Sequence, residues 1–486
     1  MSMSLPHFEV THYINGEFVE SSNKFEKLYP ATNQPVATVS EGKQDEVNAA
    51  VDAASEAFKK WGKMSPSERR PLLKAFAEGI RKYAGELAEI ETYDVGRPIR
   101  ENNSGYLTRT ANNIDFFADF AVVQGSESYP MDNGYINYVL RQPVGVAVLI
   151  TPWNIPLLLE TWKLGPCLAF GNTAVLKPAE TTPIGAWKLA HIAHEAGLPP
   201  GVFNVVEGFG PDSAGEYLTA HPDVKLISFT GETSTGQAIL RTASQNMARV
   251  SFELGGKGPN IVFDDVDMEH ALYVSKKAAF INQGEVCLSG ARILVQRGIY
   301  HEFVERFADK LVNETVLGDP LNPDTTMGAL NSQEHLKRVM GYLEIGRHEG
   351  RLMIGGDQPD LPAPFNAGNW LNPTIILDAA PDCRVNQEEI FGPVVTVVPF
   401  DEEEEAIHIA NDVKYGLSAV VQTTNTGRAV RVSGQIDAGT VWVNDWFIRD
   451  LRVPFGGMKA SGVGREGGHY SMEFYTEMKT VCLANV

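Results

Sequence analysis

One cysteine stands in a segment whose composition suits nucleophilic chemistry. Cys287 lies in Asn282-Gln283-Gly284-Glu285-Val286-Cys287-Leu288-Ser289-Gly290, between a predicted helix and a predicted strand. Small and polar neighbours leave such a thiol reachable, whereas Cys167, flanked by Leu164 and Leu168, is expected to pack. Sequence context alone leaves two interpretations of Cys287 open, a nucleophile or a buried structural thiol.

A carboxylate and a carboxamide each follow an apolar run. Glu253 comes after Val250-Ser251-Phe252 and shortly before Gly255-Gly256, so it would be poorly solvated, with a raised pKa that suits a general base. A surface glutamate at a strand end is the alternative. Asn154 ends Thr151-Pro152-Trp153-Asn154, and its side-chain N–H could stabilise an oxyanion. Asparagine is also common in turns that contain proline.

Two more strand ends could hold a dinucleotide. The segment Phe229-Thr230-Gly231-Glu232-Thr233-Ser234-Thr235-Gly236 follows an apolar run and opens a helical pattern, so free N–H groups could face a phosphate. An ordinary turn with helix-capping residues fits equally well. In Lys177-Pro178-Ala179-Glu180 the lysine and the glutamate could hold two ribose hydroxyls, and the carboxylate would repel a 2′-phosphate, which favours NAD over NADP. A solvated loop is the alternative there.

Other sequence patterns are not expected to form a binding or catalytic site. Gly462-Val463-Gly464-Arg465-Glu466-Gly467 matches GxGxxG, but no strand precedes it and too little chain follows for a βαβ unit, so we expect a backbone turn. His191 and His194 lie three apart on a predicted helix without a third ligand at a sensible spacing, so we expect no metal site. The chain has no GxSxG and no GxxxxGK[ST], which disfavours hydrolases and P-loop enzymes.

The hydrophobic pattern places the candidate residues at the ends of predicted parallel strands. Apolar runs at 144–150, 174–176, 203–206, 226–229 and 250–252 alternate with helical patterns at 157–170, 184–196 and 234–243. A second series has strands at 260–263, 292–295, 394–398, 417–421 and 440–443 and a helix at 269–282. Such alternation predicts buried parallel sheets, which place ligands at the carboxyl ends of their strands. Two α/β blocks that meet near residue 254 predict a cleft between them.

The rest of the chain is predicted to be helical or to form hairpins. Asn15-Gly16 indicates a short hairpin, and Leu72, Phe76, Ile80, Tyr83, Leu87 and Ile90 form the apolar stripe of one helix over 67–90. Asp132-Asn133-Gly134 within 129–142 is a strong hairpin signal. We expect this hairpin to project as an arm, which would need a partner subunit because two strands alone are unstable.

Composition narrows the class of protein further. The 486 residues carry 41 Lys+Arg against 61 Asp+Glu, a net charge of −20, which argues against nucleic acid and anionic membranes as partners. The four cysteines, which are Cys167, Cys287, Cys383 and Cys482, contain no CxxC pair, so neither a disulfide framework nor structural zinc is expected. With no signal peptide and no long apolar stretch apparent, we expect a soluble cytoplasmic protein.

Taken together, these segments resemble the NAD(P)-dependent aldehyde dehydrogenase superfamily over essentially the whole chain. TPWN at 151–154, KPAE at 177–180, FTGETSTG at 229–236, FELGGK at 252–257, NQGEVC at 282–287 and EEIFGP at 388–393 occur in the order of that family. The resemblance implies an α/β fold with a Rossmann-like NAD-binding domain (1–120 and 143–253), an α/β catalytic domain (254–460) and a small β oligomerisation arm (121–142 and 461–486). It also implies a homodimer or homotetramer.

The resemblance also implies roles for individual residues. Cys287 would be the nucleophile, Glu253 the base that activates water, and Asn154 part of the oxyanion hole with the backbone N–H of Cys287. Lys177 and Glu180 would hold the adenosine ribose, and Glu389 and Phe391 the nicotinamide end. The full set expected at the NAD site is Ile150, Thr151, Pro152, Trp153, Lys177, Pro178, Glu180, Phe229, Thr230, Gly231, Ser234, Leu254, Gly255, Glu389 and Phe391.

Within the family, the segment 442–457 looks like the 2-hydroxymuconic, aminomuconic and 5-carboxymethyl-2-hydroxymuconate semialdehyde dehydrogenases of aromatic-ring degradation. Their substrates carry a carboxylate, which arginine binds well. We therefore expect Arg109, Arg449, Trp162 and Phe455 at the substrate site, and a structural ion pair at Arg452. Betaine aldehyde, succinic semialdehyde or an aromatic aldehyde as substrate, or a non-catalytic protein of the same fold, are the alternatives.

Overall fold

The computed structural model describes residues 5–484, and its first large sheet has the strand order of a dinucleotide-binding fold. The order is β22-β12-β11-β8-β9-β10-β2-β3, and the five strands from β12 to β10 run parallel. The chain passes outward from β8 to β9 and β10, then returns to β11 and β12 on the other side of β8. The strand order reverses between β8 and β11, which is the position where sheets of this kind bind ligands, at the carboxyl ends of the strands. The bounds are β2 (His12–Ile14), β3 (Glu17–Val19), β8 (Val146–Ile150), β9 (Thr173–Lys177), β10 (Phe203–Val205), β11 (Val224–Thr230), β12 (Arg249–Glu253) and β22 (Gly462–Val463).

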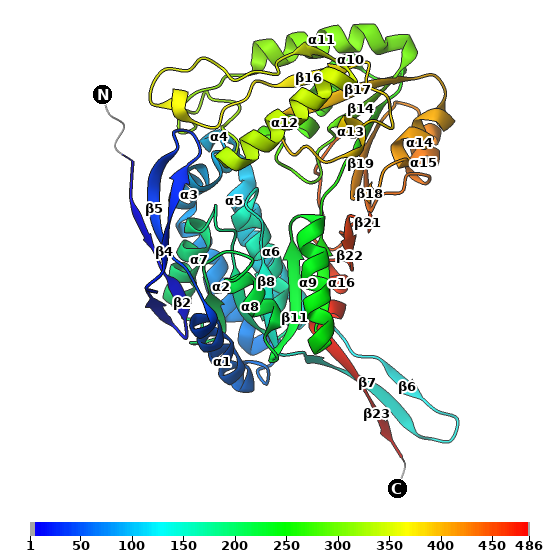
Figure 1. Ribbon diagram of the computed structural model, residues 1–486. Helices are drawn as coiled ribbons and strands as arrows, with labels where there is room; N and C mark the ends of the chain where they lie inside the picture. The colour runs from blue at the N-terminus through cyan, green and yellow to red at the C-terminus, as the bar shows by residue number, and fades with distance from the viewer. Residues whose placement is uncertain (1–4, 485–486) are drawn as a thin grey trace.

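Helices cover both faces of this sheet. Successive side chains of a strand point to opposite faces, so neighbouring residues pack against different helices. In β8, Val146 and Val148 pack in one cluster with helices α1, α8 and α9, whereas Ala147 and Leu149 pack in another with α2, α5, α6 and α7 (Figure 1). The helices are α1 (Gln44–Trp61), α2 (Pro66–Lys82), α3 (Ala84–Val95), α5 (Leu107–Val122), α6 (Pro156–Ala169), α7 (Ile184–Glu195), α8 (Ala214–Ala220) and α9 (Thr233–Asn246).

The prediction of a single helix over 67–90 is wrong. The chain forms α2 and α3, separated at Tyr83, whose backbone leaves the helical region (φ −97°, ψ 14°). The Tyr83 hydroxyl donates to Glu195 on α7. Apolar spacing predicted the buried face correctly, but it contains no information about a break between two helices that share one stripe.

The second sheet has the order β15-β16-β17-β14-β13-β19-β20 and is parallel except for β15. Its strands are β13 (Pro259–Val262), β14 (Arg292–Gln296), β15 (Arg351–Ile354), β16 (Thr374–Leu377), β17 (Val394–Phe400), β19 (Ser418–Gln422) and β20 (Thr440–Val443). Its helices are α10 (Met268–Phe280), α11 (Tyr300–Glu314), α12 (Gln333–Glu349), α13 (Arg384–Gln387), α14 (Glu403–Asn411) and α15 (Thr426–Ser433). The two expected α/β blocks are therefore present, one above the other in Figure 1.

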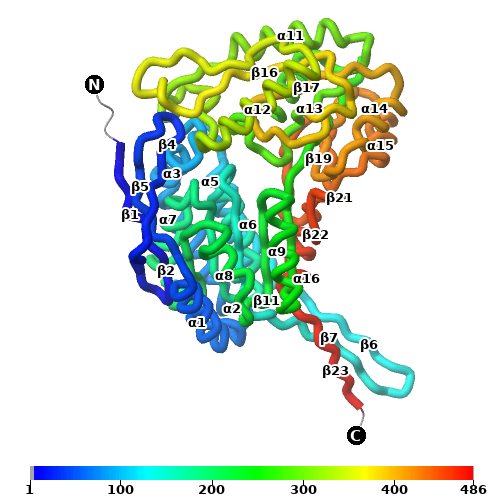
Figure 2. The backbone as a smooth tube through the Cα atoms, in the orientation of Figure 1, coloured from blue at the N-terminus to red at the C-terminus, as the bar shows by residue number. Residues whose placement is uncertain are grey.

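A three-stranded arm extends from the lower block, as Figure 2 shows. It has the order β23-β7-β6, with β6 (Ser128–Pro130), β7 (Ile136–Pro143) and β23 (Thr476–Leu483). The hairpin expected at 129–142 is thus confirmed, and β23 pairs along its full length, from Thr476 with Pro143 to Leu483 with Ile136.

The carboxyl-terminal part of the arm differs from the expected 461–486. Within that range, β22 pairs with β12 of the first sheet, and α16 (Gly468–Tyr475) packs against α6. Residues 462–475 thus lie on the first block, and only β23 lies in the arm. The reason is long-range pairing, which glycine-rich local sequence does not reveal.

Short elements complete the fold. A sheet with the order β1-β5-β4 precedes α1, and β18 pairs with β21. The bounds are β1 (Phe8–Val10), β4 (Lys24–Tyr29), β5 (Gln34–Ser40), α4 (Ile99–Glu101), β18 (Tyr415–Gly416) and β21 (Met458–Lys459), with a π-helical turn at Asn102–Tyr106 and 3₁₀ turns at Ile281–Gly284, Arg297–Ile299 and Phe365–Ala367. The Asn15-Gly16 hairpin is confirmed between β2 and β3. Over residues 5–484, no helix combines the length and apolarity needed to cross a bilayer.

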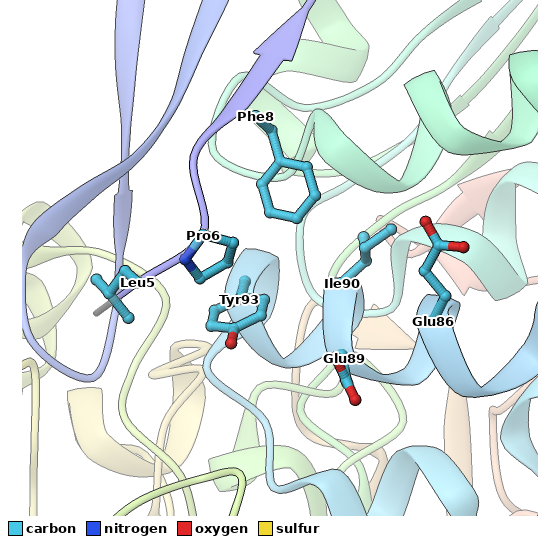
Figure 3. A pocket seen from close by; sticks show the side chains of 7 residues that line it. All are labelled: Leu5, Pro6, Phe8, Glu86, Glu89, Ile90 and Tyr93. Atoms are coloured by element: carbon cyan, nitrogen blue, oxygen red, sulfur yellow. The ribbon is translucent and has the colours of Figure 1, made fainter. Parts of the chain in front are cut away.

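A surface pocket of about 350 Å³ lies between the amino-terminal segment and α3. Figure 3 shows Leu5, Pro6 and Phe8 on one side of it and Ile90 and Tyr93 on the other. None of the residues that line it belongs to the candidate site.

Candidate active site

The carboxyl ends of four parallel strands bring the candidate residues to one edge of the first sheet. Ile150 at the end of β8 pairs in register with Lys177 of β9 and with Phe229 of β11. Thr230 of β11 pairs with Glu253 of β12. The residues that follow directly in the chain, which are Thr151, Pro152, Trp153, Pro178, Gly231, Leu254 and Gly255, therefore leave the sheet at the same edge.

This edge fits the phosphate and ribose parts of a dinucleotide. Helix α9 begins after Glu232 without a side-chain cap, so its first N–H groups remain available to an anion, and Ser234 lies in its first turn. Lys177 Nζ lies 3.9 Å from the Glu180 carboxylate and donates to the Pro178 carbonyl oxygen at 2.7 Å. A cation and a carboxylate held side by side can bind the hydroxyls of a ribose.

Two of the expected cofactor residues have side chains that point into the core. Phe229 is 4% exposed and Leu254 7% exposed, and both pack in the cluster that lines one face of the sheet. A Cβ on Gly231 would lie 2.5 Å from the Phe229 ring, so the ring itself requires glycine there. The side chains of Phe229 and Leu254 therefore serve mainly to pack the sheet against its helices.

The second block supplies the opposite wall. Glu389 Oε1 accepts a hydrogen bond from the Gly256 backbone N–H at 2.8 Å, and a Cβ on Gly255 would overlap the same carboxylate. Burial raises the pKa of Glu389 to about 7. The Phe391 ring stands edge-on to Trp153 with the ring centres 5.2 Å apart. The structure thus brings Glu389 and Phe391 to the strand ends, as expected for one end of a cofactor groove.

The loop before Cys287 has an unusual backbone. Asn282, Gln283 and Gly284 all have left-handed φ angles, of 51°, 54° and 74°. Hydrogen bonds hold this conformation: Asn282 Nδ2 donates to the carbonyl oxygens of Asn154 and Glu285, and Asn154 Nδ2 donates to the Glu285 carbonyl at 2.8 Å. One N–H of the Asn154 amide is used in this way, and the other remains for an oxyanion. Strained backbone that is fixed by surrounding bonds is typical of active sites.

Cys287 is partly exposed, whereas Cys167 is fully buried, as the sequence predicted. Burial, followed by the charges of Glu389 and Glu253, raises the pKa of the Cys287 thiol to about 12, against the lowering effect of its own N–H and of Arg449. Cys287 is therefore a thiol at neutral pH in this structure, and it would need a base or a nearby positive charge to become a thiolate.

Glu253 has the surroundings of a strong base. Its side chain is 4% exposed, and neither carboxylate oxygen has a hydrogen-bond partner among residues 5–484. Burial and then the charge of Glu466 raise its pKa well above the ordinary value, and Lys163 opposes this shift. A desolvated, unpartnered carboxylate takes up a proton readily, which suits general-base catalysis.

Two arginines lie beyond Cys287 without a carboxylate partner. The Arg449 guanidinium stacks on the rings of Trp162 and Phe455, 4.0 Å and 3.7 Å from their centres, and Arg109 stacks on Phe447 at 4.4 Å. Within the described part of the chain, neither guanidinium is within ion-pair distance of an acid, and Arg449 Nη2 is buried without a partner. Burial lowers the pKa of Arg449 to about 10. The charges of Glu466 and Glu253 oppose this shift, and repulsion from Arg109 adds to it. Two desolvated, unpaired cations form a site for an anion.

The family model of the aldehyde dehydrogenase family matches residues 18–481 of this chain. The chain belongs to the aldehyde dehydrogenase family. It is 48% identical to the 2-hydroxymuconic semialdehyde dehydrogenase of Pseudomonas sp. (strain CF600), with 98% of this chain and 99% of that protein covered. It is 44% identical to the 5-carboxymethyl-2-hydroxymuconate semialdehyde dehydrogenase of Escherichia coli, covering 95% and 98%. The crystal structure of betaine aldehyde dehydrogenase from Staphylococcus aureus in complex with NAD⁺ superposes with a TM-score of 0.94 at 36% identity, covering 97% and 94%.

Family membership confirms the expected α/β fold with its parallel-sheet domain. The GxGxxG segment of this aldehyde dehydrogenase is a turn only in part: Gly462 and Val463 form β22, and the residues after them turn toward α16, with left-handed φ at Gly464 and Gly467. Arg452 makes the expected ion pair, with Asp450 at 2.6 Å on the surface. His191 stacks on Phe18 with ring centres 3.8 Å apart, so aromatic packing accounts for it.

The sequence did not single out several residues of the aldehyde dehydrogenase site. Glu466, 4% exposed, accepts from Trp162 Nε1 and lies 3.2 Å from Lys163 Nζ and from Ser228 Oγ. Glu466 is thus buried near Glu253 and hydrogen-bonded to the Trp162 indole, on which the Arg449 guanidinium stacks. Its only sequence signal is its place in a glycine-rich turn, and more than 300 residues separate it from Lys163. Phe447 and His335 were missed for the same reason, since only folding brings them to the site. Glu285 stands two residues before Cys287, but its contact with His335 likewise depends on the fold.

Proposed function

We propose that this aldehyde dehydrogenase oxidises a semialdehyde that carries a carboxylate to the corresponding acid, with NAD as the hydride acceptor. One observation supports this substrate class: the guanidinium groups of Arg449 and Arg109, beyond the Cys287 thiol, have no carboxylate partner among the described residues. The names of the 2-hydroxymuconic and 5-carboxymethyl-2-hydroxymuconate enzymes support the same class, because their substrates are acidic semialdehydes.

Three side chains, those of Cys287, Asn154 and Glu253, carry the chemistry. The Cys287 thiol first loses its proton to solvent, and the thiolate Sγ then forms a bond with the aldehyde carbon. The electron pair of the C=O bond moves to oxygen, which becomes an alkoxide that accepts hydrogen bonds from the free N–H of Asn154 and the backbone N–H of Cys287. NAD, when bound, accepts hydride and adds a positive charge to the groove, which lowers the pKa of neighbouring thiols and carboxyls. Loss of hydride from the former aldehyde carbon leaves a thioester on Cys287.

Hydrolysis then frees the enzyme. Glu253 takes a proton from water, the hydroxide oxygen adds to the thioester carbon, and the C–S bond breaks. The products are a carboxylic acid and the regenerated Cys287 thiolate. Covalent capture holds the reacting carbon in place before hydride leaves, which is the advantage of the thiol.

Cofactor preference is proposed from Glu180. Its carboxylate stands 3.9 Å from Lys177 Nζ at the end of β9, where it would accept hydrogen bonds from ribose hydroxyls. A phosphate on the same ribose would meet a negative charge, so NAD is preferred over NADP.

We also propose a domain division and an assembly. The NAD-binding domain takes in residues up to 120, 143–253 and 462–475, the catalytic domain 254–460, and the arm 121–142 with β23. The arm exposes Ile136, Leu140 and Met478, and it fits a contact with a second copy in a homodimer or homotetramer. All four cysteines are free, which fits a reducing compartment such as the cytoplasm.

A panel of aldehydes tests this function. The purified protein is assayed with 2-hydroxymuconic semialdehyde, its 5-carboxymethyl derivative, betaine aldehyde and neutral aldehydes, each with NAD and with NADP. We expect the highest kcat/KM for an acidic semialdehyde with NAD, and no NADH formation by Cys287→Ala. A preference for neutral or cationic aldehydes would contradict the substrate class, and turnover by the alanine variant would contradict the nucleophile.

A further inference from the structure

Phe391 is held in a backbone conformation that a bulky residue rarely adopts. Its φ is +64°, in the left-handed region that favours glycine. The carbonyl oxygen of the same residue lies 2.6 Å from His335 Nε2, the shortest polar contact that His335 makes. A left-handed phenylalanine persists only where its surroundings fix it, and such positions cluster at functional sites.

His335 is in turn rigidly placed. It lies in the first turn of α12, where its backbone N–H donates to the Ser332 cap at 3.1 Å. Its ring packs against Trp153, with centres 4.9 Å apart, and against the Phe391 ring at 6.0 Å. The residue is 8% exposed. Burial lowers the pKa of His335 to about 4, so the imidazole is neutral at pH 7 and carries one N–H. Because a carbonyl oxygen only accepts, that proton lies on Nε2.

The same nitrogen faces the nucleophile loop. Glu285 Oε1 lies 3.6 Å from His335 Nε2 and accepts the backbone N–H of Asn331 at 3.0 Å. Glu285 stands two residues before Cys287, and its backbone carbonyl accepts from Asn154 at 2.8 Å. His335 therefore contacts both walls of the groove: Trp153 from the first block, and Phe391 and Glu285 from the second.

We propose that His335 is a positioning residue that fixes the left-handed backbone of Phe391 and so holds the Phe391 ring against Trp153 at the nicotinamide end of the groove. His335 touches neither reacting atom and acts through Phe391. The proposal rests on the proposed function, because it takes Phe391 as part of the NAD site. It adds a residue whose hydrogen bond, rather than a contact with the cofactor, determines affinity for NAD.

Two substitutions separate the donor from the ring. His335→Phe keeps an aromatic ring beside Trp153 but removes the N–H. His335→Gln removes the ring but keeps an N–H at the position of Nε2. Affinity for NAD is measured by titration calorimetry on the purified protein without aldehyde, so no turnover is involved. Phe391→Ala and the double variant His335→Phe/Phe391→Ala complete a double-mutant cycle.

We expect H335F to raise the Kd for NAD about tenfold, which corresponds to ~1.4 kcal/mol, and H335Q to raise it no more than about threefold. On the F391A background, H335F should add less than about twofold, because the ring that it positions is already absent. Additive effects of the two substitutions, or a loss with H335Q equal to that with H335F, would overturn the proposal.

Further measurements distinguish this proposal from the proposed function. If Lys177→Ala and F391A both leave the Kd for NAD unchanged, the assignment of the groove to NAD fails, and the positioning role fails with it. If F391A weakens binding and H335F does not, only the positioning role is wrong. Should H335F fold poorly, Phe391→Gly should restore its thermal stability, since glycine adopts the same φ without strain. If the H335F substitution lowers thermal stability equally in the wild-type background and in the Phe391→Gly background, the proposal is contradicted.

Discussion

The guanidinium of Arg449 lies 3.7 Å from the centre of the Phe455 ring, and its Nη2 is buried without a hydrogen-bond partner. A desolvated cation that makes no direct ion pair is costly for the folded protein, although the charges of Glu466 and Glu253 act on it from farther away. We propose that a substrate carboxylate completes the site, so that the feature that lowers stability would also provide specificity.

Arg449→Ala tests this role. We expect KM for an acidic semialdehyde to rise at least about tenfold, or ~1.4 kcal/mol, with little change for a neutral aldehyde of similar size. Arg452→Ala is the matched control, because Arg452 is exposed and paired with Asp450. Steady-state kinetics with the two aldehydes give the result. Equal increases for both aldehydes would show that Arg449 supports the fold rather than the substrate carboxylate.

Glu253→Gln is expected to stop the reaction after hydride loss. The amide cannot take a proton from water, so the thioester on Cys287 should accumulate and the steady-state rate should fall by roughly a hundredfold or more. Intact-protein mass spectrometry after mixing with NAD and aldehyde detects the acylated enzyme. Glu180→Gln, which also removes one carboxylate near the groove, serves as the control and should not accumulate it. Normal turnover by the Glu253 variant would assign the base elsewhere.

The pH dependence of Cys287 alkylation follows from its raised pKa. The reactive form is the thiolate, and with a pKa of about 12 its fraction grows about tenfold for each pH unit throughout pH 7–10. We therefore expect the iodoacetamide rate of the cofactor-free enzyme to rise over this whole range without a plateau. Adding NAD should raise the rate at pH 7, because a nearby cation lowers a thiol pKa. Peptide mass spectrometry that follows Cys287 separately from the exposed Cys482 measures it. A plateau near pH 8 without NAD would contradict a Cys287 pKa raised by burial.

Glu180 should control the choice between cofactors. With Glu180→Gln, the repulsion of a 2′-phosphate is removed while Lys177 stays in place, so kcat/KM with NADP should rise at least about fivefold relative to NAD. Kinetics with both cofactors at fixed aldehyde measure the ratio. Glu195→Gln, on the surface of α7, is a control and should leave the ratio unchanged. An unchanged ratio in the Glu180 variant would place the ribose away from this carboxylate.

Leu140→Glu should weaken the assembly. Leu140 is exposed on β7 of the arm, and a charge there would be buried in any contact with a second copy. Sedimentation velocity should show a shift toward smaller species, whereas Lys82→Glu on α2 should not change the distribution. If the wild-type protein sediments as a monomer, the proposed role of the arm in assembly is contradicted.

The local sequence determined most of the secondary structure, and it identified the residues whose side chains could take part in catalysis or binding. Strands such as β8 and β9 are continuous apolar runs because they are buried on both faces, and the Asn-Gly and Asp-Asn-Gly turns require left-handed φ. Cys287, Glu253 and Asn154 were identifiable because each follows a recognisable strand or loop, and the family resemblance gave them their roles.

Tertiary structure alone decided how these groups interact. Glu466 reaches Lys163 and Trp162 across some 300 residues of chain, and β22 joins the first sheet rather than the arm. His335 meets Phe391 and Glu285 only because the fold packs the start of α12 against both segments. The physical reason is that burial and charge proximity set the pKa of Cys287 and Glu253 and leave Arg449 unpaired, and both depend on contacts between segments that are distant in the sequence. Periodicity and turn chemistry report only a residue's near neighbours in the chain.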